Sequence, residues 1–428
     1  MPSIGRRTLL LGSAASLGMP WLLPGRVWAA GPSEKLSVAV IGVAGRGRQN
    51  LDGVSDEQIA ALCDVDSENL AAAAARFPAA KLYRDFRKMF DEMHAQIDAV
   101  VVSTPDHTHA PAGAAALRLG KHLYCEKPMA HEVFEVRTLT ELAARGKLIT
   151  QLGTQIHAAQ NYRRVVELIR AGAIGPVGEV HVWASAKYSA GDRPKDTPPV
   201  PPNLDWDLWL GPAPHRPYHP AYVPARWRSW WDFGTGTLGD FYCHYGDLAF
   251  WALDLKYPTT VEAEGPPPHP EGCPEWLIVR YEFPARGDAP PVKLTWYDSG
   301  RRPPLLDQLG QKGWSSGVLF VGRDGYVLSD YARHKLLPED KFRDYQRPAP
   351  SIPNSPGHYR EWIDGCKTGK AASCDFAYSG PLTEAALLGA AAYRSGERFA
   401  WNAAELRTIN ADKAQRYIRR DYRPGWTL

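Results

Sequence analysis

Apolar residues follow two different rhythms along this chain. Between residues 35 and 155, continuous apolar runs such as KLSVAVIGV, IAALCDVD and DAVVVSTP alternate with segments such as SENLAAAAARF and VFEVRTLTELAARG, whose apolar residues recur every three or four positions. Continuous runs are typical of parallel strands buried on both faces, and the wider spacing is typical of helices. The pattern therefore predicts an α/β fold with a doubly wound parallel sheet.

The pattern changes after about residue 155. One amphipathic helix, NYRRVVELIRAGAIG, precedes runs that alternate apolar and polar residues: VGEVHVWAS, EWLIVRYEF, VKLTWYD and GVLFVGRDGYVLSD, the last with a hairpin signal at Asp324-Gly325. Alternation predicts strands of an antiparallel or mixed sheet with one packed face. We therefore expect two domains, residues 35–155 and 156–428, the second an α+β domain with a large open sheet. We also expect a long proline-rich loop over about 192–224, and a helix over 381–396 that packs back on the first domain.

The first 30 residues have the layout of an export signal. Arg6-Arg7 precedes a moderately apolar stretch that ends near VWAA, with cleavage expected after Ala29. This is the pattern of a Tat signal. The stretch falls short of the ~20 apolar residues needed to span a membrane. We expect the protein to pass through the Tat translocase, to be periplasmic or secreted, and to leave the membrane after processing.

Composition narrows the remaining possibilities. The formal net charge of +3 over 428 residues is too small to suggest a nucleic-acid partner. The chain contains six cysteines and no C-x-x-C motif, so no metal site is expected. Export permits disulfides, and Cys366 and Cys374 are the pair to check.

A candidate nucleotide site follows the first predicted strand. The chain reads Gly42-x-Ala44-x-x-Gly47 with an additional Gly45, which is the dinucleotide fingerprint of a Rossmann domain with its middle glycine replaced by alanine. Asp64 ends the second strand about 20 residues later, where an acid binds the ribose hydroxyls. A carboxylate there repels a 2′-phosphate and favours NAD. NADP stays open if Arg46 or Arg48 pairs with that phosphate.

Two further strands end in polar motifs, VVSTPDHTH and HLYCEKP. Ligands of such sheets bind beyond the carboxyl ends of the strands. For His107 a surface position is an equal alternative, and His109 is expected at the surface. The predicted cofactor-binding residues are therefore Gly42, Ala44, Gly45, Arg46, Gly47, Asp64, Thr104, Pro105, His107, Glu126 and Lys127.

The fingerprint, STPDHTH, CEKP and the later GTGTLGDFYCHYGDLAFW together resemble the Gfo/Idh/MocA oxidoreductase family, from Lys35 to about Trp401. The resemblance implies that Lys127 stands beside the nicotinamide and the reacting substrate carbon. It also implies that Asp240 and His244 form the Asp-x-x-x-His motif of the substrate site, and that the protein is a dimer or tetramer.

Dehydrogenation of an alcohol requires an acceptor for the hydroxyl proton as well as one for the hydride. His244 is the expected proton acceptor, because the unperturbed pKa of histidine is near ~6.5. Lys127 supplies positive charge where alkoxide character develops, or acts as the base itself if burial lowers its pKa. Asp240 contacts a second hydroxyl or orients the base. A core histidine satisfied by a helix neighbour is the structural alternative for His244.

The leading interpretation is an NAD(P)-dependent oxidoreductase acting on a sugar, a polyol or a glycoside. The cofactor is expected to be tightly bound, because the export signal sends the protein where free NAD is scarce. Alternatives are a redox-neutral NAD-dependent glycosidase, against which Lys127 counts, and a non-catalytic nucleotide-binding sensor or scaffold. Substrate candidates are Tyr162, Trp231 and Asp247. One or two of six tryptophans are expected to line the site: Trp183, Trp206, Trp209, Trp227, Trp230 and Trp231.

Overall fold

The computed structural model describes residues 34–428, and the predicted Tat signal lies outside them. The first domain is built on a six-stranded sheet in the order β3-β2-β1-β4-β5-β6, with every pairing parallel. Its strands are β1 Ser37–Ile41, β2 Gln58–Cys63, β3 Lys81–Tyr83, β4 Ala99–Val102, β5 His122–Cys125 and β6 Thr150–Leu152. The predicted doubly wound sheet is confirmed, and the strand order reverses between β1 and β4.

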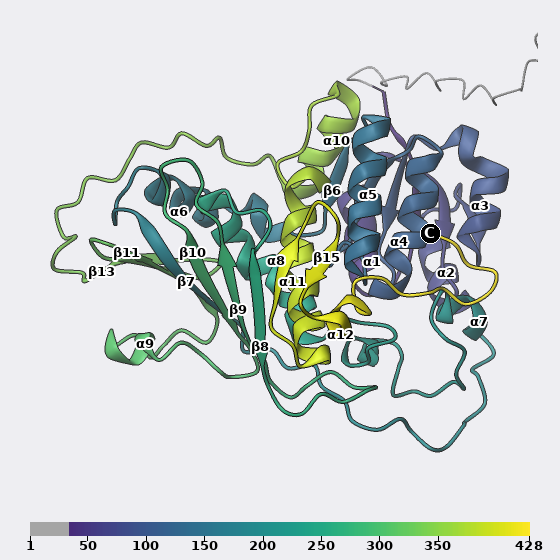
Figure 1. Ribbon diagram of the computed structural model, residues 1–428. Helices are drawn as coiled ribbons and strands as arrows, with labels where there is room; N and C mark the ends of the chain where they lie inside the picture. The colour runs from purple at the N-terminus through teal and green to yellow at the C-terminus, as the bar shows by residue number, and fades with distance from the viewer. Residues whose placement is uncertain (1–33) are drawn as a thin grey trace, which may run out of the picture.

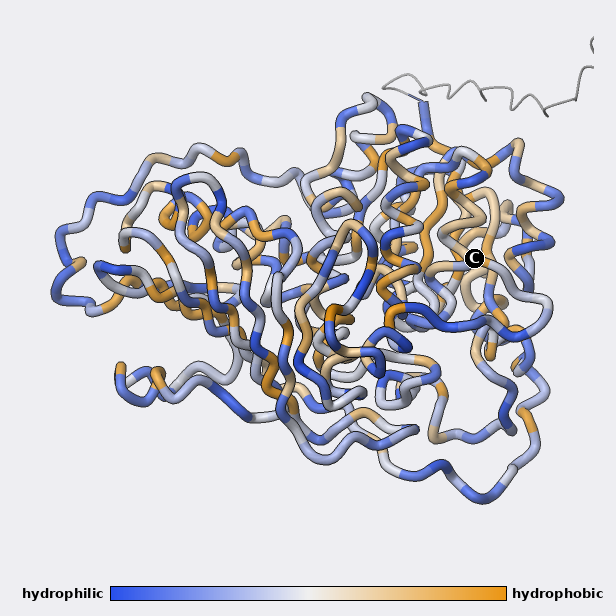
Figure 2. Tube along the Cα trace, viewed as in Figure 1, coloured by the Kyte–Doolittle hydropathy of each residue, from blue (hydrophilic) through white to orange (hydrophobic). Residues whose placement is uncertain are grey.

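Helices cover both faces of this sheet, so that every residue of β4 and β5 is buried (Figure 1). The helices of this domain are α1 Arg46–Gly53, α2 Ser67–Ala74, α3 Phe86–Met93, α4 Asp106–Arg118 and α5 Val133–Gly146, with the short 3-10 helix η1 His94–Gln96. The apolar residues form an inner band in Figure 2. Burial on both faces explains why these strands have continuous apolar runs.

The second domain is built on a nine-stranded mixed sheet in the order β13-β12-β11-β7-β10-β9-β8-β14-β15. Among the described pairings of this second sheet, only that of β7 with β10 is parallel. The strands are β7 Val177–Trp183, β8 Thr260–Glu264, β9 Ile278–Phe283, β10 Val292–Tyr297, β11 Gly317–Gly322, β12 Tyr326–Ser329, β13 His334–Leu337, β14 Phe399–Asn402 and β15 Arg407–Ile409. The hairpin predicted at Asp324-Gly325 joins β11 and β12.

Helices of the second domain return to the first. The longest are α6 Gln160–Arg170, α8 Gly236–Leu253, α10 His358–Thr368 and α11 Phe376–Ser395, and the short ones are α7 Trp206–Leu210, α9 Leu305–Gln308, α12 Asp412–Gln415, η2 Gln155–Ala158 and η3 Arg226–Ser229. Helix α11 packs against both α8 and α5. At the α5 contact, Arg137 makes a bidentate ion pair with Glu384, with both N–O distances 2.9 Å.

Two segments without long helices or strands cross between the domains, and we call them the strap (192–224) and the tail (416–428). The strap reaches the first domain at Leu204, which forms a bridge with Asp66. The tail reaches it at Arg420, which pairs with Glu135 at 3.0 Å, and at Trp426, which packs on Phe86. Both segments therefore bind the two domains together.

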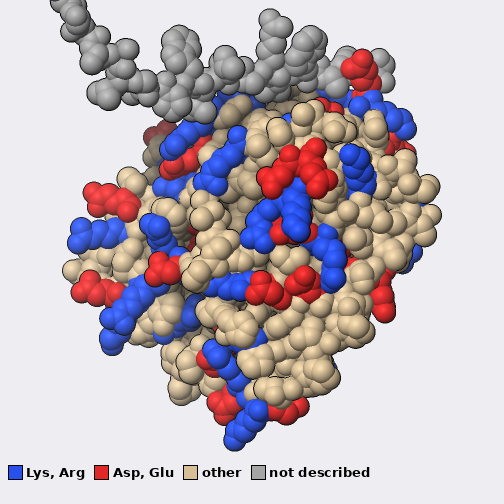
Figure 3. All heavy atoms as spheres, turned by 90° about the vertical axis from the view of Figure 1, so that its right-hand side faces the viewer, with Lys and Arg blue, Asp and Glu red and all other residues tan. Residues whose placement is uncertain are grey.

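All six cysteines are buried and free, so Cys366 and Cys374 form no disulfide. Among residues 34–428, no helix combines the length and the apolar character needed to cross a membrane. On the face shown in Figure 3, basic and acidic side chains are interspersed rather than gathered by sign.

Candidate active site

A cleft of about 1550 Å³ lies between the domains, beyond the carboxyl ends of the parallel strands. Asp64, which follows β2, and Lys127, which follows β5, both line it. These strands lie on opposite sides of the reversal between β1 and β4, the place where open α/β sheets bind ligands. We call the part near Asp64 the adenosine end and the part near Lys127 the reaction end.

Three glycines around the start of α1 are required for different reasons. Gly42 has φ of +83°, and a Cβ there would lie 2.8 Å from the carbonyl of Ser103. Gly47, in the first turn of α1, is buried against the β1–α1 loop, where a Cβ would lie 2.0 Å from the Gly42 oxygen. Gly45 has φ of +55° and lines the cleft, and a Cβ there would meet nothing within 4 Å. Ala44 and Arg46 also line the cleft, whereas Gly47 and Arg48 do not.

Asp64 is held in place by backbone amides. Its Oδ2 accepts a hydrogen bond from the Val43 amide and its Oδ1 one from the Asp66 amide, both at 2.9 Å. Burial raises the pKa of the Asp64 carboxyl, although these amides act in the opposite direction. Each oxygen retains a lone pair for a ribose hydroxyl. The fixed carboxylate thus has the position and the chemistry of a ribose ligand.

The motif after β4 divides between the cleft and the core. Thr104 and Pro105 line the cleft, and the Thr104 hydroxyl is buried without a partner in the described chain. His107 lies outside the lining, where its Nε2 contacts the Trp209 carbonyl at 2.9 Å. The expectation that His109 is at the surface is wrong. That ring is buried, 2.7 Å from the Thr104 carbonyl and 2.8 Å from the Pro128 carbonyl, because it links two strand-end loops.

Three charged groups converge at the reaction end. Lys127 Nζ lies 2.6 Å from Asp240 Oδ1, and Arg228 Nε donates to the same oxygen at 3.1 Å. Burial acts to raise the pKa of Asp240, but the two cations outweigh it and lower that pKa to about 2. Burial likewise acts to lower the pKa of Lys127, but Asp240 outweighs it and raises that pKa above its usual value. Asp240 therefore favours the cationic form of Lys127, the opposite of the lowered pKa that a lysine base requires.

His244 lies one turn after Asp240 on α8 and lines the same end of the cleft. Burial, with Lys127 nearby, lowers the pKa of His244 to about 3. The expectation that this ring titrates near its unperturbed pKa is therefore wrong, because sequence spacing carried no information on desolvation. The ring is neutral at neutral pH, and its Nδ1 is buried with no hydrogen-bond partner in the described chain.

Glu126 is the buried acid behind Lys127. Its Oε1 accepts hydrogen bonds from Gln155 at 2.8 Å and from Asn50 at 3.0 Å. Burial raises the pKa of Glu126. Gly153 is required here, because a Cβ would lie 2.6 Å from the Glu126 carboxyl carbon. This network fixes the backbone from which Lys127 projects.

The three substrate candidates lie outside the cleft lining. The Tyr162 ring is buried below α8, and its hydroxyl donates to the His244 carbonyl at 3.2 Å. Trp231 is buried and donates to the His269 carbonyl. Asp247 shares a helix face with Asp240, but it lies two turns further on, about 10 Å along the axis. Facing the same side of a helix was therefore not sufficient to reach the cleft.

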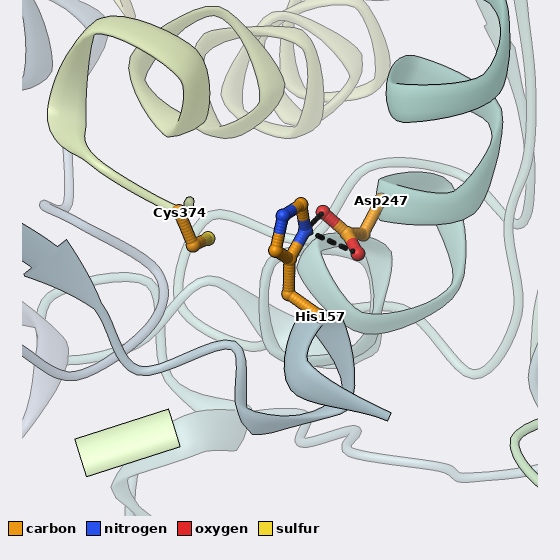
Figure 4. A group of neighbouring side chains, drawn as sticks. All are labelled: His157, Asp247 and Cys374. Atoms are coloured by element: carbon orange, nitrogen blue, oxygen red, sulfur yellow. Dashed lines mark hydrogen bonds and ion pairs between the residues drawn. The ribbon is translucent and has the colours of Figure 1, made fainter. Parts of the chain in front are cut away.

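Asp247 instead belongs to a closed group with His157 and Cys374 (Figure 4). Its carboxylate oxygens lie 2.9 and 3.0 Å from His157 Nδ1, and Tyr378 donates to it at 2.7 Å. In Figure 4 the imidazole stands between the carboxylate and the sulfur. One ligand atom from each of the three residues lies within 4.8 Å of the other two, which is the spacing of a metal-ligand set, and His157 Nδ1 is already bonded to Asp247.

Several cleft residues were not predicted from the sequence. Of the tryptophans considered, Trp209 and Trp227 line the cleft and Trp183, Trp206, Trp230 and Trp231 do not. Asp106 lies inside the motif after β4 and Phe241 directly follows Asp240, so their positions within these motifs were the available signal. The others come from segments with no motif: Tyr188, Asn203, Arg228, Tyr331 and Trp426.

Sequence comparisons match this architecture. Residues 36–154 match the NAD-binding Rossmann fold of an oxidoreductase family, Gfo/Idh/MocA, and residues 159–288 match the C-terminal α/β domain of the same family. Inositol 2-dehydrogenase 3 of Saccharopolyspora erythraea is 36% identical over 124 residues, which are 28% of this chain and 36% of that protein. Myo-inositol 2-dehydrogenase of Thermotoga maritima is 27% identical over 172 residues, 39% of this chain and 47% of that protein. The chain thus matches less than half the length of these relatives.

A solved structure extends the likeness to most of the fold. The WlbA dehydrogenase of Bordetella pertussis, solved with NADH and UDP-GlcNAcA, superposes with a TM-score of 0.60 at 18% identity, covering 86% of this chain and 99% of that one. At this identity the likeness concerns the fold alone. With both family domains matched in order along more than half of its length, this chain belongs to the Gfo/Idh/MocA oxidoreductase family.

Proposed function

We propose that the protein is an NAD-dependent oxidoreductase that moves a hydride between the nicotinamide cofactor and a carbon bearing a hydroxyl or carbonyl group in a sugar, polyol or glycoside. The observation that carries this proposal is the 2.6 Å pair between Lys127 and Asp240, with His244 one turn away, at the carboxyl end of β5. The relatives that are inositol dehydrogenases support a polyol or sugar substrate.

The residues of the cleft fit NAD. Gly45 leaves open space at the start of α1, where a helix N-terminus favours a pyrophosphate. Asp64 would hold the adenosine ribose, and the unpartnered hydroxyl of Thr104 offers a hydrogen bond near the reaction end. Two acids, Asp64 and Asp66, flank the ribose position, which disfavours the 2′-phosphate of NADP.

The side chains at the reaction end have complementary roles. NAD, when bound, supplies the acceptor for the hydride. Lys127, fixed as a cation, hydrogen-bonds the substrate oxygen and stabilises negative charge that develops there. Because Lys127 and Arg228 both bind Oδ1 of Asp240, its Oδ2 is left to accept a hydrogen bond from a second substrate hydroxyl. His244, neutral and with an unprotonated ring nitrogen, is the proposed acceptor of the hydroxyl proton, a role that requires its pKa to rise well above 3 once cofactor and substrate are bound.

We further propose that the cofactor is tightly bound and enters the export route with the folded protein, through the Tat translocase to the periplasm or beyond, where the protein acts as a homo-oligomer. Contacts made by the strap support the proposal that the cofactor is tightly bound. Asn203 Nδ2 donates to Asp66 Oδ2 at 2.9 Å, and Arg84 donates to the carbonyls of Val65 and Asn203, so the strap crosses the adenosine end. A ligand beneath such a crossing is released slowly.

The test uses the purified full chain. After exhaustive dialysis and denaturation, the supernatant is assayed for NAD(H), and the folded protein is assayed for NADH formation with a panel of sugars and polyols. Near-stoichiometric dinucleotide and hydride transfer to or from the bound cofactor are expected. Protein that binds no dinucleotide at all contradicts the proposal. Release of sugar from an aryl glycoside without net NADH would favour the glycosidase alternative.

A further inference from the structure

We propose that the substrate carries a carboxylate and that Arg228 binds it, so that the reaction end selects a sugar acid or a related polyhydroxy acid over its neutral counterpart. This deepens the proposed function and rests on it in one respect, namely that the substrate binds at the reaction end. Arg228 lies in η3, outside every motif of the sequence, and lines the cleft beside Trp227.

Two cations at the reaction end share one carboxylate oxygen. Lys127 and Arg228 both donate to a single oxygen, Asp240 Oδ1, at 2.6 and 3.1 Å. Asp240 is also the one carboxylate that pairs with Arg228 among the described residues. Two further acids lie near these cations, Glu126 beside Lys127 and Asp106 near Arg228, and burial raises the pKa of both. Neither pairs with Arg228 in the described chain, so an anionic ligand would give Arg228 a partner that it does not share with Lys127.

The guanidinium of Arg228 is held in place before a ligand arrives. It lies 4.2 Å from the centre of the Trp227 ring and 5.8 Å from that of Tyr188. Its backbone is also confined, because a Cβ on Gly234 would lie 2.6 Å from the Arg228 Cα. The side chain retains 25% exposure. Its Nε donates to Asp240 and its Nη1 to the Ala225 carbonyl at 3.4 Å, which leaves Nη2 and the second Nη1 proton to donate to the two oxygens of a carboxylate.

The surroundings suit a hydroxylated ligand that also carries this acid. The rings of Tyr188 and Phe241 stack with centres 6.2 Å apart, and Tyr331 also lines this end of the cleft. Aromatic faces contact the C–H faces of sugars, and Asp240 Oδ2 accepts from a hydroxyl. A carboxylate on Arg228 would then fix the ring relative to Lys127 and His244. A neutral sugar has no carboxylate to accept hydrogen bonds from the remaining N–H donors of Arg228.

The test compares acids with their neutral partners on the NAD-loaded protein. The pairs are D-glucuronate with D-glucose, D-galacturonate with D-galactose, and D-gluconate with D-sorbitol. Binding is followed by calorimetry and turnover by NADH formation, in wild type, Arg228→Gln and Arg228→Lys. The matched control is Arg226→Gln, because Arg226 lies in the same 3-10 helix but is exposed and outside the cleft lining.

We expect at least one acid to bind more than tenfold better than its neutral partner. Arg228→Gln should weaken the binding of that acid by about 10- to 100-fold, the usual effect of losing a hydrogen bond to a charged group. Arg226→Gln should leave the binding of the acid unchanged. The affinity of Arg228→Lys for that acid should lie between the affinities of Arg228→Gln and wild type, since lysine keeps the charge and loses the paired donors. Three outcomes would overturn the inference. These are tighter binding of the neutral partner in every pair, an equal loss of affinity for acid and neutral partner in Arg228→Gln, and no binding of any of the six compounds. An acid that binds through Arg228 without hydride transfer would support it and contradict the proposed function instead.

Discussion

At the reaction end, one oxygen of Asp240 receives hydrogen bonds from two cations, and the consequences for each residue can be measured. Replacing Lys127 with methionine, Lys127→Met, removes the charge and keeps the length of the side chain. We expect kcat to fall by roughly 10²–10³, the usual effect of losing a group that stabilises developing negative charge. Bound NAD(H), measured by its release on denaturation, should stay near the wild-type amount, because Asp64 and the β1–α1 loop are unchanged.

Lys88→Met serves as the control, because Lys88 is exposed on α3. Wild-type turnover in Lys127→Met would remove Lys127 from the chemical step.

His244 leads to a different prediction. Because burial lowers its pKa to about 3, the ring is already unprotonated at pH 5 and above. His244→Ala should therefore reduce kcat/KM by roughly 10²–10⁴ without altering the shape of its pH profile between pH 5 and 8. The measurement is kcat/KM across this range in both proteins, because this parameter reports the pKa values of the free enzyme. Disappearance of a limb centred near pH 6.5 would mean that the ring titrates normally and is better solvated than the structure shows.

The pKa of Asp106 is raised, whereas that of His244 is lowered. Burial raises its pKa to about 7, so between pH ~4 and 7 the folded protein holds a proton that the unfolded chain has released. The free energy of unfolding contributed by this group therefore falls as the pH rises through that range. Asp106→Asn cannot ionise but still accepts the 2.9 Å hydrogen bond from Thr235. Relative to wild type, its free energy of unfolding should rise by roughly 2–3 kcal/mol between pH 5 and pH 8.

Urea unfolding at the two pH values measures this difference, with the exposed Asp91→Asn as control. The same difference between Asp106→Asn and wild type at both pH values would show that the Asp106 carboxyl has an ordinary pKa.

Single residues were predictable from the sequence where a motif fixed their position at a strand end. Lys127, Asp64 and Thr104 line the cleft because the carboxyl ends of parallel strands meet at one edge. Arg228 was not predictable, because it comes from a short 3-10 helix without periodicity. Helix periodicity misplaced Asp247, since spacing gives the face of a helix but not which turns of it border the cleft.

At the scale of elements, the strap determines access to the adenosine end. Asn203→Ala removes the 2.9 Å hydrogen bond to Asp66 and leaves the reaction end unchanged. We expect bound NAD to be lost several-fold faster in Asn203→Ala than in wild type, with kcat unchanged when NAD is added in excess. Loss of one hydrogen bond to a charged group, about 1.5–3 kcal/mol, permits an effect of this size.

The rate is measured from the dinucleotide that remains after timed dialysis. Lys195→Ala is the matched control, since Lys195 lies on the strap, is exposed and does not line the cleft. Equal release rates in Asn203→Ala and wild type would show that the strap does not limit release.

The sequence predicted the parallel strands, the half-apolar strands and the hairpin after β11, because periodicity reports burial of each face. It also predicted a long loop over 192–224, from proline content. What it lacked was the partner of that loop, since the bridge between Leu204 and Asp66 joins residues with no shared pattern. Contacts between irregular segments depend on the assembled fold rather than on local periodicity.

At the scale of the molecule, the cleft is shared by two domains that the strap, the tail and α11 hold together. Loss of NAD should therefore affect the unfolding of the whole chain. A ligand present at about a thousand times its Kd stabilises the folded state by roughly 4 kcal/mol. We expect the dinucleotide-free protein to melt roughly 5 °C below the loaded protein, in calorimetric scans of both. Identical melting temperatures would mean that the cofactor binds weakly or equally to the unfolded chain.

The tail determines when, during synthesis of the chain, the cleft can be completed. Trp426 lines the same cleft as Gly42, and Arg423 pairs with Asp207 of the strap at 2.6 Å. During synthesis the first domain can fold as soon as it emerges from the ribosome. The cleft, however, lacks one of its walls until almost all of the described chain has been translated. The complete NAD site can therefore form only after nearly all of the polypeptide has been synthesised. A secretion machinery that threads the chain during synthesis would export the protein before it could bind the dinucleotide in that site.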